Sequence, residues 1–125
     1  MINVIKQIEY WQTGAEEEML NAQVMIENKR YLAGLFFCHL SIEKILKALV
    51  VKITEDHPPR THDLERLSVI AQITLDDEQM TFLTEMQVFQ IEGRYPENFP
   101  NPNAAMANDF YEQTLKMHQW LRQKL

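Results

Sequence analysis

The stretch that decides the fold of this protein is residues 31–55, YLAGLFFCHLSIEKILKALVVKITE. It holds no proline, and its only glycine is Gly34. Because residues in an α-helix advance by about 100° each, its apolar side chains occupy most of the helical circumference. A helix that is apolar nearly all round is surrounded by neighbours, in a bundle or against a partner subunit. We therefore predict a central, largely buried helix over residues 31–55.

Three polar residues interrupt this apolar surface: His39, Glu43 and Lys47. Their spacing of four places them on one ridge of the helix, and a buried imidazole or carboxylate must be paired. In one interpretation His39 and Glu43 satisfy each other, and Lys47 extends to water. In the other, Glu43 lines a pocket with Lys44 or Lys47, whose ammonium contacts a phosphate. Spacing alone leaves both open.

The segments on either side of this stretch are also helical in pattern, because their apolar residues recur every three or four positions. They cover about 3–28, 63–72, 76–92 and 104–124. Asn3 and Asn103 stand where N-caps are expected, and Thr74-Leu75-Asp76-Asp77 is typical of a capping sequence. No segment alternates like a strand. All five prolines fall in two short stretches that predict loops. The expectation is a single all-α domain, 1–125: an up-and-down antiparallel bundle of four long helices plus one short helix.

Composition excludes several function classes. The net charge of −6 argues against a general electrostatic DNA or RNA binder, which needs a basic face. No window of about 18 residues is apolar enough for a membrane span. A single cysteine, Cys38, indicates the reducing cytoplasm. Cys38 and His39 point about 100° apart on a helix, so they are no nucleophile–base pair, and no catalytic motif is found.

The first proline loop reads EDHPPRTHDLERL. Thr61 and Asp63 can cap the helix that follows it. Alternatively, His62 at the start of this helix attracts an anion together with Arg60. His57 and His62 lie five positions apart in a loop, which is a poor arrangement for a metal site, so we predict none.

The second proline loop contains Arg94-Tyr95-Pro96. Pro96 disfavours helical geometry at Tyr95, so the preceding helix must end near this point. One interpretation packs Tyr95 and Phe99 against the bundle. The other uses Arg94 as an anion clamp and Tyr95 as a stacking surface for a base.

Taken in order, these segments resemble the HEPN family (higher eukaryotes and prokaryotes nucleotide-binding). The resemblance runs from about Trp11 to Leu121 and is strongest at Glu43-Lys44-x-x-Lys47-Ala48-Leu49, His62-Asp63-Leu64 and Arg94-Tyr95-Pro96. It implies an up-and-down helical bundle that usually dimerises. Many members act with a minimal nucleotidyltransferase as a toxin–antitoxin pair, and the toxic branch cleaves RNA with an arginine followed four to six residues later by a histidine. No arginine of this sequence has a histidine at that spacing.

The resemblance therefore implies a non-catalytic module, a homodimer that binds a nucleotide or a nucleotidyltransferase partner. One alternative is a divergent RNA-cleaving member whose site assembles across a dimer from His39, Glu43, His62 and Arg94. Another alternative is a purely structural partner. It would bury the apolar side chains of residues 31–55 that remain uncovered against a second chain. The candidate ligand-binding residues are His39, Glu43, Lys44, Lys47, Arg60, His62, Asp63, Arg94 and Tyr95.

Overall fold

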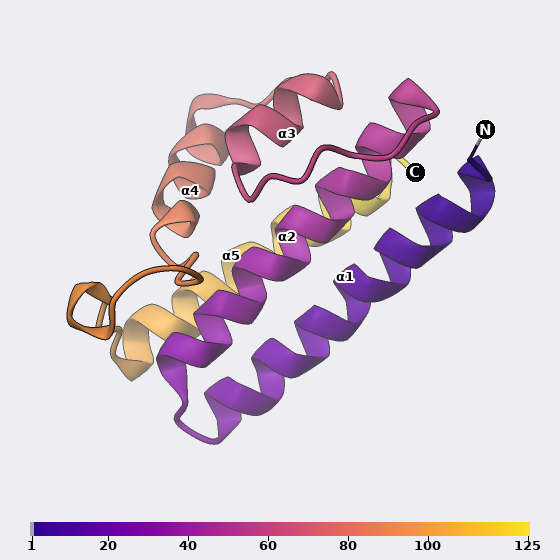
Figure 1. The fold of residues 1–125 in the computed structure, drawn as a ribbon. Coiled ribbons are helices and arrows are strands. Elements are labelled where there is room, and N and C mark those ends of the chain that lie inside the picture. The colour runs from indigo at the N-terminus through magenta and orange to yellow at the C-terminus, as the bar shows by residue number, and fades with distance from the viewer. Residues whose placement is uncertain (1) are drawn as a thin grey trace.

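The computed structural model describes residues 2–125, and within them all regular secondary structure is helical. The elements are α1 (Val4–Glu27), α2 (Tyr31–Thr54), α3 (Leu64–Ile70), α4 (Asp77–Gln87), the 3-10 turn η1 (Pro96–Asn98) and α5 (Ala104–Arg122). α1, α2 and α5 run side by side along most of their lengths, whereas α3 and α4 cover one side of α2 (Figure 1). The predicted all-α fold is confirmed.

α2 is the central helix, as the sequence predicts, because it contacts each of the other four α-helices. Most of its second half is buried, from Ser41 to Val51 with only Lys44 partly exposed. α1 approaches α2 closely where Gly34 faces Ile26, since a Cβ on Gly34 would lie 2.5 Å from Ile26 Cγ1. No described helix, α2 included, combines the length and apolar character that crossing a membrane requires.

The helix starts agree with the sequence, but one helix end does not. The side chains of Asn3, Asp76 and Asn103 each accept a backbone N–H in the first turn of a helix. α4 ends at Gln87 rather than at about residue 92. The reason is Arg94, whose guanidinium donates to the backbone carbonyls of Val88 at 2.7 Å and of Asn98 at 2.8 Å. These bonds hold the chain after Gln87 in turns instead of a further helical turn.

The segment between α2 and α3 positions the candidate site. Glu55, at the C-terminal cap of α2, adopts a left-handed conformation with φ 56°, and the chain then runs back along α2 (Figure 1). This return path places His62 beside Glu43, although nineteen positions separate them in sequence. The first proline loop is therefore packed along the central helix.

Candidate functional site

The polar ridge of α2 is buried and centred on one carboxylate. Glu43 is 4% exposed and Lys47 is 7% exposed, while His39 is completely enclosed. The Lys47 ammonium donates to Glu43 Oε2 at 3.1 Å. His39 Nδ1 lies 3.8 Å from Glu43 Oε1, which is too long for a hydrogen bond. The ridge thus differs from the simple interpretation, because Lys47 pairs with Glu43 in the interior instead of extending to water.

The main partner of Glu43 Oε1 is His62, from the first proline loop. The distance from His62 Nδ1 to Glu43 Oε1 is 2.8 Å. Because an ionised carboxylate only accepts hydrogen bonds, His62 Nδ1 carries the proton. The His62 side chain is 49% exposed, and its Nε2 atom lies 3.6 Å from Glu92 Oε2. A buried carboxylate therefore orients a half-exposed imidazole.

Gln87, at the end of α4, completes the network, and its neighbours fix the orientation of its amide. Its Oε1 accepts from the backbone N–H of Leu64 at 3.0 Å, so its Nε2 is the donor. This Nε2 donates to the backbone carbonyl of His62 at 2.9 Å and to His39 Nε2 at 3.2 Å. His39 therefore accepts at Nε2 and carries its proton on Nδ1, facing Glu43. Sequence reasoning missed Gln87, since a glutamine at a helix end carries no distinguishing signal.

His39 is held neutral. Burial lowers its pKa from 6.5 to about 4, although the negative charge of Glu43 partly opposes this shift. The Nε2–H donor of Gln87 also favours the neutral form of His39. If His39 Nε2 were protonated, two N–H donors would face each other. His39 is thus a neutral structural element of the network at neutral pH.

On its outer side, Lys47 borders a cavity of about 430 Å³. The other lining residues are Trp11, His57, Pro58, Pro59 and Arg60. Lys47 Nζ lies 5.2 Å from the centre of the Trp11 ring, within cation–π range. Arg60 is exposed, and no acidic residue lines this cavity. We call it the Trp11 pocket. Because Glu43 already pairs with Lys47, Arg60 is the cation of this pocket that can contact a phosphate, beside the Trp11 face on which a base can stack.

Lys44 lies in a neighbouring cavity that also has Trp11 in its wall. Its ammonium is 3.3 Å from Glu18 Oε2, and a Cβ on Gly14 would lie 3.1 Å from Lys44 Cδ. The structure therefore does not bring Lys44 together with Arg60, and Glu18 balances the Lys44 charge.

Three other candidates have local roles. Asp63 Oδ1 accepts from the backbone N–H of Arg66 at 3.2 Å, and so caps α3. Arg94 is committed to backbone carbonyls around its own loop, as described above. Tyr95 is 72% exposed, so it does not pack against the bundle as one interpretation expected. None of these three residues lines the Trp11 pocket.

Two features bear on chemistry. Burial raises the pKa of the Cys38 thiol to about 12, so the thiol stays protonated and unreactive. Within residues 2–125, no group of three or more histidine, cysteine, aspartate or glutamate side chains is placed to hold a metal ion.

The described residues thus form a helical bundle with a pocket lined by Trp11, Lys47 and Arg60. The HEPN domain model matches residues 8–124, nearly the whole chain. The protein belongs to the HEPN domain family, which confirms the resemblance seen in the sequence. No curated protein and no solved structure gives a significant match.

Proposed function

We propose that this HEPN domain is a non-catalytic module that binds a nucleotide and acts in a HEPN/minimal nucleotidyltransferase system of the toxin–antitoxin type. The observation that carries the proposal is the Trp11 pocket. It joins an indole to the cations Lys47 and Arg60 on a chain whose net charge is −6. Since Glu43 balances Lys47, the uncompensated charge of the pocket is that of Arg60, and such a local positive charge attracts phosphate.

The volume of the pocket is suitable for a ligand of nucleotide size. Its volume of about 430 Å³ lies within the range of small-molecule sites, roughly 300–1,000 Å³. Pro58 and Pro59 form a stiff wall, since proline has a fixed φ. We place the base against Trp11 and the phosphates toward Lys47 and Arg60.

The non-catalytic part of the proposal rests on the histidines. No histidine follows an arginine at the spacing of the family ribonuclease motif. His39 accepts from Gln87 and is fully buried, so it has no access to a substrate.

One observation favours a second candidate, a divergent RNA-cleaving member. His62 is half-exposed and is oriented by the carboxylate of Glu43, an arrangement typical of a general base. Incubation of the pure protein with total RNA tests this candidate beside His62→Ala. Degradation that disappears in the variant supports it, and equal degradation or none counts against it.

We further propose a homodimer and a nucleotidyltransferase partner. Leu20 and Val24 are apolar, exposed and one turn apart on the outer face of α1, which supports association through this helix. Light scattering should give the mass of a dimer for the isolated chain. A monomer mass would contradict the proposed homodimer. An adjacent gene for a small nucleotidyltransferase would support the system, whereas its absence from the locus would count against it.

Calorimetric titration with ATP, GTP, CTP and UTP tests the nucleotide claim. We expect a saturable signal for at least one of them, weakened about tenfold by Arg60→Ala, because a charge-assisted hydrogen bond contributes about 1.5–3 kcal/mol. Arg66→Ala is the matched control, since Arg66 is exposed and lines none of the described pockets. No heat at millimolar nucleotide, or equal weakening by both variants, would contradict the proposal.

A further inference from the structure

A second surface of the molecule is hollowed, on the side where α4 faces α5. Three adjoining cavities of about 290, 380 and 420 Å³ follow these two helices. The first two share Glu78, Phe82 and Gln113, and the last two share Glu85. They therefore form one continuous depression, which we call the α4–α5 groove.

Apolar and polar side chains of α4 and α5 line the groove at regular helical spacing. On α4 and the turn after it, Glu78, Phe82, Glu85 and Phe89 line the groove at intervals of four, three and four residues. The row on α5 has the same alternation: Met106, Phe110, Gln113, Met117 and Trp120. Intervals of three and four are those at which helices pack along a shared seam. Phe82 and Phe89 are only 5% and 4% exposed, and both rings pack on Phe110, so these rows join α4 to α5. The exposed apolar side chains of the groove are Met106 and Val88.

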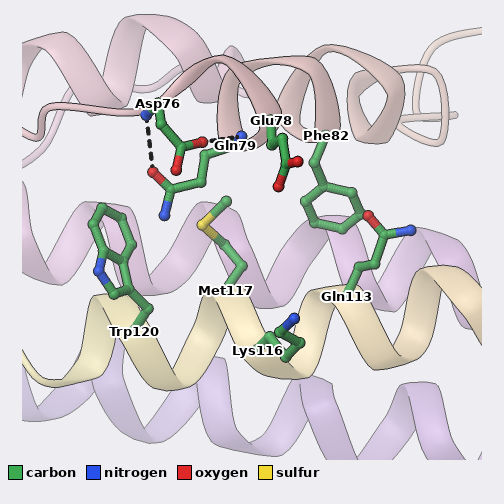
Figure 2. A pocket seen from close by; sticks show the side chains of 8 residues that line it. All are labelled: Asp76, Glu78, Gln79, Phe82, Gln113, Lys116, Met117 and Trp120. Atoms are coloured by element: carbon green, nitrogen blue, oxygen red, sulfur yellow. Dashed lines mark hydrogen bonds between the residues drawn. The ribbon is translucent and has the colours of Figure 1, made fainter.

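Figure 2 shows the end of the groove near Trp120. The Trp120 and Phe82 rings stand on either side of Met117, and the Glu78 carboxylate points into the space above it. Asp76 and Gln79 are engaged with each other at the start of α4. Within residues 2–125, neither Glu78 nor Glu85 is held by a salt bridge or a side-chain hydrogen bond. These two carboxylates are available to an incoming cation.

Most of the charged residues at the rim of the groove are acidic. Four acidic residues of the groove come from α4 and the residue before it, Asp76, Asp77, Glu78 and Glu85, and α4 contributes no basic residue. Lys116 on α5 is the only basic residue that lines the three cavities. Such a rim repels phosphate backbones and complements a cationic surface.

We propose that the α4–α5 groove binds a basic amphipathic helix of a partner protein. The apolar face of that helix lies on Met106 and Val88, and its lysine or arginine side chains reach Glu78 and Glu85. Eleven steps along the chain separate Glu78 from Phe89, or about 16 Å at helical rise, which corresponds to about three helical turns of the partner. A second copy of this chain is a poor occupant, because it brings another charge of −6. The proposal does not depend on nucleotide binding.

The test uses a fluorescein-labelled synthetic helix of eighteen residues, with leucines at intervals of three and four and lysines elsewhere. Fluorescence anisotropy with the full chain should show saturable binding in the micromolar range. The charge-reversed Glu78→Lys/Glu85→Lys variant should weaken it at least tenfold. Glu27→Lys/Glu65→Lys is the control, with the same charge change at two exposed positions away from the groove, and it should change the affinity less than threefold.

A second variant separates groove binding from general attraction between opposite charges. Met106 is apolar and 43% exposed at one end of the groove, in the first turn of α5, where an aspartate is compatible with the helix. Met106→Asp adds a negative charge, so pure electrostatic attraction would tighten binding of the cationic peptide. The proposal expects at least threefold weakening instead.

Several outcomes would overturn the proposal. They are an absence of saturable binding at several hundred micromolar peptide, tighter binding by Met106→Asp, and equal weakening by the two double variants. Self-association of the chain that is lost in Glu78→Lys/Glu85→Lys would also overturn it, because a second copy would then occupy the groove. Circular dichroism of each variant confirms that the helices are intact.

Discussion

The two tryptophans of this protein each border a cavity, and the charged residues that line these two cavities differ. Trp11 borders a pocket with Lys47 and Arg60, and no acidic residue lines it. Trp120 borders a groove whose rim is mostly acidic. Each indole has a lysine ammonium over its ring, Lys47 at 5.2 Å and Lys124 at 4.2 Å. The aromatic–cation pair is therefore common to both regions, and the surrounding charges distinguish them.

The two regions also differ in how their charges are supported. Lys47 belongs to a buried network in which Glu43 binds both Lys47 and His62. Glu78 and Glu85 are exposed side chains on a single helix. Buried charges need partners, whereas exposed ones are solvated by water. Removal of Glu43 from the first region should therefore lower the stability of the fold, whereas removal of Glu78 or Glu85 from the second should mainly alter what binds there.

The largest expected effect comes from Glu43→Ala. It leaves the buried Lys47 ammonium without its carboxylate, so we expect the free energy of unfolding to fall by about 3–5 kcal/mol. The matched Glu78→Ala should change it by less than about 0.5 kcal/mol, as is usual for exposed positions. Urea denaturation of both variants measures the difference. An equal loss of stability in the two variants would contradict this difference between the two regions.

A smaller effect concerns pH. The pKa of His39 is about 4 in the folded protein and near 6.5 in the unfolded chain, so between these values only the unfolded chain binds the proton. Stability therefore falls as pH decreases from about 6.5 to 4, and His39 accounts for about 3 kcal/mol of this loss. Denaturation series at several pH values should give a flatter slope for His39→Asn. His57→Asn, at an exposed position, should keep the original slope, and a slope unchanged in both variants would disprove the prediction.

The next effect tests whether the two regions act independently. Arg60→Ala should weaken nucleotide binding about tenfold, or about 1.4 kcal/mol, and leave peptide affinity within twofold. Glu78→Lys/Glu85→Lys should do the reverse. Binding assays with both ligands on both variants provide the comparison. Substantial loss of both ligands in either variant would show that the regions are coupled.

The smallest expected effect is a change in the free energy of unfolding caused by a substitution beside Trp120. Lys124→Met removes the ammonium over Trp120 and should lower the free energy of unfolding by about 0.5–1 kcal/mol, as expected for an exposed cation–π pair. Thermal denaturation beside Lys6→Met, an exposed lysine at the start of α1, checks this value. A loss of several kcal/mol would mean that the groove also depends on a buried network.

Much of the fold was predictable from residues 31–55 and the placement of prolines. The central helix, the N-caps and the positions of the loops all follow from local patterns. The end of α4 did not, because it depends on Arg94 bonding back to carbonyls around its own loop. For the site, the ridge of α2 predicted that Glu43 and Lys47 lie side by side. It could not indicate Gln87, which reaches the network only because α4 packs beside α2.

The sequence by itself determined an all-helical HEPN domain, because helical periodicity, caps and breakers act over a few neighbouring residues. Only the tertiary structure decided which polar residues meet. The return of residues 55–63 along α2 brings His62 to Glu43 and Arg60 to the pocket of Trp11 and Lys47. These contacts join residues that are far apart in the chain, and their geometry depends on the path of a loop that no local propensity specifies.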